Sequence, residues 1–76
     1  MTLQSFEQTL LSFKRREPFE PFLVELRDGR VVEIDEPAAL VFAGNGASFL
    51  APDYEIVSFR ASDVVAIRPA SPEAAS

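Results

Sequence analysis

The stretch "LVELRDGRVVEI", residues 23–34, decides the fold of this chain, because the turn inside it determines which side chains face inward. Apolar and polar residues alternate on both sides of the turn, which predicts the two strands of a hairpin. A two-residue turn at Asp28 and Gly29 would pair Val24 with Glu33. That register would place a carboxylate on the apolar face of the strands, so it is disfavoured.

A three-residue loop removes this conflict. The loop consists of Arg27, Asp28 and Gly29, with Gly29 in the left-handed conformation of a bulge. Val24 then pairs with Val32. A slip by one residue would turn every side chain to the other face, so the register is strongly specified. The sequence therefore predicts one shared apolar side, made of Phe22, Val24, Leu26, Val32 and Ile34.

A second hairpin is predicted around "GNG", residues 44–46, which lies between the apolar runs "AALVFA" and "ASFLA". Asn-Gly in this setting is typical of a two-residue turn. A turn at Asn45 and Gly46 would pair Phe42 with Phe49. Both faces of this hairpin are largely apolar, so either both are covered within the domain, as in a small barrel, or one contacts another subunit.

The segment "TLQSFEQTLLSFKRR", residues 2–16, has the apolar spacing of an amphipathic helix, with Thr2 as its N-cap. Lys14, Arg15 and Arg16 lie at the end of the helix, where cations are favoured by the helix dipole. Helix termination explains this basic trio. The alternative is that it contacts an anion or a nucleic acid.

Prolines separate this helix from the first strand. Pro18 and Pro21 end the helix and hold "EPFEPF" extended, because proline disfavours helical geometry in the residue before it. In such a segment three residues make one turn, so Phe19 and Phe22 should point to the same side and connect the helix to the sheet.

Two further segments complete the predicted domain. "YEIVSFR" predicts a fifth strand over residues 54–60, and "VVAI" a short sixth segment over residues 64–67. The final stretch "PASPEAAS" contains little that could be buried. We therefore expect a single domain over residues 1–68 and a disordered C-terminal tail over residues 69–76.

Composition favours self-association. A chain of 76 residues has a small core, and disulfides, metals or partner subunits usually help such chains to fold. The chain has no Cys and no His, so it can form no disulfide and lacks the usual ligands of zinc and haem. Its 47% hydrophobic content includes seven Phe, more apolar surface than one small core would cover. These features predict a homo-oligomer without a cofactor or a bound metal.

The net charge of −5 argues against nucleic-acid binding, because neutralising phosphates requires an excess of Lys and Arg. No apolar run approaches the roughly 20 residues of a membrane-spanning helix, and the first residues lack the basic region of a secretory signal. We therefore expect a cytoplasmic protein that is not associated with membranes.

Catalysis is not expected. Nucleophilic catalysis requires a nucleophile beside a base, and without His or Cys the sequence offers only carboxylates, Lys14 and Tyr54 as bases. Asp35 and Glu36 are adjacent and could in principle hold a hard cation or act as an acid and base pair. A solvated strand end before a proline explains them better, so the sequence predicts no enzyme.

Two stretches resemble the Sm and Hfq-like small barrels. "VELRDGRVV", residues 24–32, is similar to the first Sm motif, and "FRASDVVAI", residues 59–67, is similar to the second. The resemblance implies a small, strongly bent, five-stranded antiparallel barrel with an N-terminal α-helix. It also implies a ring in which neighbouring subunits pair their edge strands, often with RNA at the pore.

Carried over by position, Arg60 matches the RNA-contacting arginine of that family and Asp63 the acidic or amide residue after it. Phe59 adjoins Arg60 and could stack on a base, whereas the other Phe residues have core-facing spacing. Ala61 stands where the family usually has Gly. The chain also resembles small bacterial proteins that share a helix and "PFxPFxxxLxDGR", a resemblance that implies no activity.

Taken together, the sequence predicts a mainly β fold with one N-terminal α-helix. The function that we expect is that of a non-catalytic, self-associating small β-barrel, acting as a scaffold or as a module for protein–protein interaction with a partner that the sequence does not identify. The alternative is a ring-forming, RNA-binding protein that uses Arg60 and the basic residues 14–16.

Overall fold

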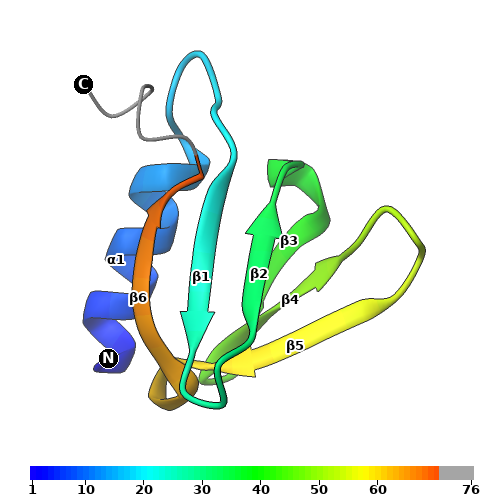
Figure 1. Cartoon of the computed structure of the whole chain (residues 1–76). Helices are drawn as coiled ribbons and strands as arrows, with labels where there is room; N and C mark the ends of the chain where they lie inside the picture. The colour runs from blue at the N-terminus through cyan, green and yellow to red at the C-terminus, as the bar shows by residue number, and fades with distance from the viewer. Residues whose placement is uncertain (71–76) are drawn as a thin grey trace.

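The structure, a computed structural model, describes residues 1–70 and consists of one α-helix and two three-stranded antiparallel sheets (Figure 1). The strands of the first sheet are arranged in the order β2-β1-β6 and those of the second in the order β3-β4-β5. The elements are α1 (Leu3–Lys14), β1 (Phe22–Leu26), β2 (Val31–Ile34), η1 (Pro37–Ala39), β3 (Leu40–Ala43), β4 (Gly46–Leu50), β5 (Ile56–Arg60), η2 (Ala61–Asp63) and β6 (Val64–Pro69).

Helix α1 confirms the helix predicted at the start of the chain. The side chain of Thr2 accepts a hydrogen bond from the amide of Ser5 at 3.2 Å, as expected of an N-cap. Phe6 and Leu10, four residues apart on one face of the helix, are fully buried. Helix α1 therefore covers the core with the apolar stripe that its sequence indicates.

The hairpin of β1 and β2 has the predicted register. Val24 pairs with Val32, and Phe22 pairs with Ile34. Gly29 has a φ of +90°, a left-handed conformation that L side chains rarely adopt. Phe22, Val24, Leu26 and Ile34 are buried and Val32 is half-buried, so the predicted apolar side does face the core.

The second hairpin was predicted in the wrong register. Phe42 pairs with Ala47 rather than with Phe49, and the two turn residues are Gly44 and Asn45. Gly44 has a φ of +58°, and a glycine with positive φ at the first of two central positions suits a hairpin turn. The turn therefore begins one residue earlier than the sequence pattern suggested.

A close approach between strands explains this register. Gly46 is the first residue of β4 and lies directly against β5. A Cβ atom at Gly46 would collide with the carbonyl oxygen of Phe59 and lie 2.7 Å from Cα of Arg60. The glycine is therefore required for space within the sheet and is not a turn residue.

The predicted five-stranded barrel is not what the structure shows. Within residues 1–70 there are six strands in two separate sheets, and their hydrogen bonds do not close a barrel. The extended chain between β2 and β3 is interrupted at Pro37, where η1 begins. The side chain of Glu36 accepts a hydrogen bond from the amide of Ala38 at 3.1 Å at this point. Because proline has no N–H to donate, strand pairing does not continue through it.

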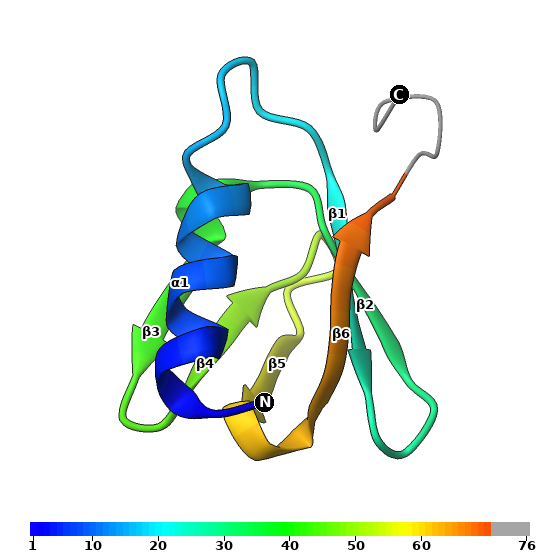
Figure 2. The same cartoon turned by 90° about the vertical axis from the view of Figure 1, so that its left-hand side faces the viewer.

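Aromatic residues join α1 to both sheets. The ring of Phe6 lies edge-on to Phe42 of the second sheet, with centroids 6.4 Å apart. Phe13 lies 5.0 Å from Phe22 of the first sheet, and Phe19 also contacts Phe22, at 6.1 Å. Figure 2 shows the helix lying across the strands. The helix thus closes a core that the two sheets share, and the predicted role of Phe19 and Phe22 in connecting helix and sheet agrees with these contacts.

The last strand extends past the predicted domain boundary at residue 68, so the first two residues of the predicted tail belong to the fold. Strand β6 includes Pro69, and the amide of Ala70 donates a hydrogen bond to the carbonyl of Pro21 at 3.1 Å. The rest of the predicted tail, residues 71–76, lies outside the described residues. Over residues 1–70 no helix has both the length and the apolar character needed to cross a membrane.

Candidate functional site

The residues predicted to contact RNA lie at two ends of the molecule. Helix α1 runs from the bottom of Figure 1 to the top, so Lys14 lies at its upper end, with Arg15 and Arg16 directly after it. Strand β5 ends at the bottom, and Arg60 is its last residue. The arginine and the basic trio therefore do not form one surface.

Two of the three basic residues at the end of α1 have partners within the fold. The Lys14 ammonium donates a hydrogen bond to the carbonyl of Leu40 at 2.9 Å and lies 6.0 Å from the ring centroid of Phe42. The guanidinium carbon of Arg16 lies 4.6 Å from the ring centroid of Phe13. Arg15 is exposed. Lys14 thus connects the end of the helix to β3.

Phe59 cannot stack on a nucleic-acid base. Its side chain is only 4% exposed, and its ring packs edge-on against Phe6 at 6.1 Å. Asp63 closes the η2 turn, because its carboxylate accepts a hydrogen bond from the Arg60 amide at 3.2 Å. The carbonyl of Asp63 also accepts from the amide of Arg27 at 2.9 Å. Residues 59–67, which resemble the second Sm motif, thus form the end of β5, the η2 turn and the first part of β6, and the ring of Phe59 is buried.

Asp28 stabilises the turn of the first hairpin. Its carboxylate accepts hydrogen bonds from the Arg30 amide at 3.0 Å and from the Arg30 Nε at 2.7 Å. The backbone hydrogen bond from Arg30 is the main reason that the pKa of Asp28 is lowered, and the Arg30 side chain adds to the effect. This carboxylate therefore stabilises the turn.

Asp35 and Glu36 border the same hollow of the surface. One oxygen of Glu36 is used in the hydrogen bond to the Ala38 amide that begins η1. Over residues 1–70 no three Asp or Glu side chains gather as a group that could hold a metal ion. Asp35 borders two hollows of the surface instead, together with Ala51 and Pro52.

The outward side of the second sheet has no acidic residue. Because side chains alternate along a strand, the register places small and aliphatic side chains on this side. It also places Arg60 here, at the end of β5 and two residues after Ser58. Ile56 is 72% exposed, Val41 54% and Leu50 46%. The hydroxyls of Ser48 and Ser58 hydrogen-bond to each other at 2.9 Å across β4 and β5. We call this set the neutral face: Val41, Ala43, Ser48, Leu50, Ile56 and Ser58.

The outward side of the first sheet carries charged side chains, together with Val31, which is 51% exposed. Glu25 of β1 forms an ion pair with Arg68 of β6, with an Nη2 to Oε1 distance of 2.7 Å. Glu33 lies on the same side, since it pairs with Leu23, two residues from Glu25. The two sheets thus share an interior but present different outer surfaces.

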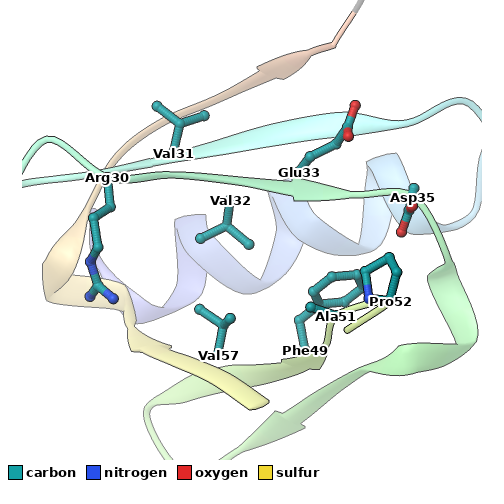
Figure 3. A pocket seen from close by; sticks show the side chains of 9 residues that line it. All are labelled: Arg30, Val31, Val32, Glu33, Asp35, Phe49, Ala51, Pro52 and Val57. Carbon is teal, nitrogen blue, oxygen red and sulfur yellow. The ribbon is translucent and has the colours of Figure 1, made fainter. Parts of the chain in front are cut away.

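A groove of about 420 Å³ lies between β2 and the second sheet (Figure 3). Val32, Phe49 and Val57 form its apolar floor. Arg30 lies at one end of the groove and Asp35 at the other, next to Pro52, whereas Glu33 points away from it. The groove therefore combines an apolar floor with an acidic end.

Comparisons with known proteins do not assign a function to either surface. No protein-family model matches the chain, and neither a curated protein nor a solved structure matches it. The sequence did contain a signal for the neutral face, because the run from Leu40 to Leu50 has no charged residue. The groove had no such signal, since its floor comes from three strands that are brought together only by the fold.

Proposed function

We propose that the protein is a non-catalytic, self-associating module for protein–protein interaction, and that the neutral face is the surface through which two copies meet. A strand side with several exposed aliphatic side chains is rarely left open to water without a role. Among the described residues, three of the seven exposed large hydrophobic side chains lie together on the neutral face: Val41, Leu50 and Ile56.

The observation that supports this proposal is the distribution of charge. The chain carries a net charge of −5, so two copies repel each other over most orientations. The neutral face has no carboxylate, and the only charged residue in β3, β4 and β5 is Arg60, a cation at the edge of the same side of the sheet. Contact through this face buries aliphatic side chains without opposing like charges, as the centres of protein interfaces usually do.

We also propose that the two sheets correspond to an open form of the small barrel that the Sm-like motifs suggested. In this interpretation β2 and β3 are two halves of one bent strand, separated by η1, and β5 continues into β6 through η2. Each half of the bent strand pairs within a different sheet, which gives the two three-stranded sheets that are observed.

Light scattering coupled to size-exclusion chromatography tests the self-association over a concentration series. We expect the mass to rise above the 8.4 kDa of one chain as the concentration increases. The rise should persist at high salt, because contact between apolar surfaces is not weakened by screening. A mass of one chain at every concentration up to the millimolar range would reject the proposal.

A further inference from the structure

The groove beside β2 has features of a binding site for an extended peptide, and it lies apart from the neutral face. Strand β2 is at the edge of its sheet, because β1 is its only neighbour in that sheet. In an antiparallel pair, alternate residues exchange hydrogen bonds with the neighbouring strand, and those between them point their N–H and C=O groups to the other side.

The first hairpin shows which residues of β2 point outward. The amide of Leu26 donates to the carbonyl of Arg30 at 2.9 Å, so the alternation makes Val24 and Val32 the next hydrogen-bonded pair. Val31 and Glu33 therefore direct their N–H and C=O groups away from β1. Over residues 1–70 these groups have no backbone partner in another strand, and both residues border the groove.

The groove fits the side chains of a strand added at this edge. Alternate side chains of such a strand would point inward, as Val32 does, onto a floor that Val32 and Val57 share with the buried ring of Phe49. Addition of a peptide strand to a sheet edge is a recurring mode of recognition, in which backbone hydrogen bonds supply affinity and pockets for alternate side chains supply specificity.

Charge indicates what kind of segment binds. At one end of the groove Arg30 is paired with Asp28 at 2.7 Å, so this end offers little net charge. At the other end Asp35 borders the groove, and Glu36 adjoins it in the neighbouring hollow. A second copy of this acidic chain is a poor occupant here, whereas a segment with a basic residue at this end is complementary.

We propose that β2 accepts an extended segment of a partner protein as an added strand. The segment places an apolar side chain on the groove floor and a Lys or Arg side chain beside Asp35. This interaction is independent of the neutral face, so an oligomer built through that face would still present the groove. The two proposals can therefore fail separately.

The test uses short capped peptides of alternating Val and Thr with one central Phe, and each peptide carries one Lys, at the first or at the last position. Binding is followed by the amide chemical shifts of the full chain. We expect the amides of Val31 and Glu33 to shift, with those of Val41 and Ile56 unaffected. A Glu peptide should bind about threefold more weakly than the matching Lys peptide, the size of an exposed ion pair.

Two matched controls make the test decisive. Asp35→Lys changes an exposed residue outside the core, and it should reverse the preference between the Lys and Glu peptides. Methylation of the peptide amides that face β2 should weaken binding at least about fivefold, since backbone hydrogen bonds are lost. No shifts at Val31 and Glu33, an unchanged preference in Asp35→Lys, or equal binding of the methylated peptide would each overturn the proposal.

Discussion

The two sheets of this protein have the same number of strands and share one core, yet they meet the solvent differently. The first sheet carries the Glu25–Arg68 ion pair and Glu33 on its outer side. The second carries Ile56, Leu50 and a pair of hydrogen-bonded serines. Inward-facing residues are apolar in both sheets because they build the fold. The choice of residues on the two outer sides is therefore not explained by the stability of the fold.

The largest effect that we predict is loss of stability in the second sheet after Gly46→Ala. The new methyl group would collide with the backbone of Phe59 and Arg60, and backbone atoms cannot move aside as a flexible side chain can. We expect a destabilisation of about 3 kcal/mol, at the upper end for overpacking, measured by urea unfolding.

The matched change in the first sheet is Gly29→Ala. No atom lies within 4 Å of the added Cβ atom, and only the positive φ of +90° is unfavourable. The cost should be about 1 to 2 kcal/mol, the penalty of a left-handed L residue. A smaller loss of stability in Gly46→Ala than in Gly29→Ala would contradict the claim that β4 approaches β5 too closely for a side chain at position 46.

The next effect concerns self-association. Ile56→Lys places a charge in the neutral face, where its desolvation on contact should weaken association by about 2 to 3 kcal/mol, roughly 30- to 150-fold. The fold should be unaffected because Ile56 is 72% exposed. The variant can be compared with the parent by sedimentation at several concentrations.

Val31→Lys is the control for this experiment. Val31 is 51% exposed on the charged side of the first sheet, so the change in exposure and chemistry is similar. This variant should associate as strongly as the parent. Equal weakening by both substitutions would show that the two outer sides do not differ in function.

A smaller effect is expected at the contact between α1 and the second sheet. Lys14→Met keeps the length of the side chain but removes the hydrogen bond to the carbonyl of Leu40. The loss should be about 1 kcal/mol, typical of one hydrogen bond, and it should appear as a lower unfolding midpoint. Arg15→Met, at an exposed position next to it, should leave the midpoint unchanged within error.

The smallest effect is pH-dependent and belongs to the first sheet. Because the pKa of Asp28 is lower in the folded than in the unfolded chain, its contribution is present above the unfolded pKa and is lost as the pH falls through the folded pKa. Asp28→Asn should therefore be less stable than the parent at neutral pH and should approach it in acid. A stability difference that grows on acidification, in unfolding curves at several pH values, would contradict this assignment.

The first hairpin was predictable from sequence because a single constraint decided it. A carboxylate at Glu33 had to face water, and only a loop ending at Gly29 allowed this. Local patterning was also sufficient for α1, where the cap at Thr2 and the spacing of Phe6 and Leu10 agree. In these elements the residues that fix the structure are close together in sequence.

The second hairpin and the barrel were not predictable in the same way. The position of the turn depends on the contact between Gly46 and β5, which is distant in sequence. Uncharged residues on both faces gave no penalty for a wrong register. The division into two sheets depends on η1 at Pro37, and the burial of Phe59 on its contact with α1. Each of these is a tertiary interaction.

The most direct test of the difference between the sheets is a dilution series followed by amide chemical shifts. We expect the amides of β3, β4 and β5 on the neutral face, those of Val41, Leu50 and Ile56 among them, to shift with concentration. Those of Glu25, Glu33 and Arg68 should stay constant. Shifts confined to the first sheet, or none in either sheet, would contradict the central claim that the neutral face is the surface of self-association.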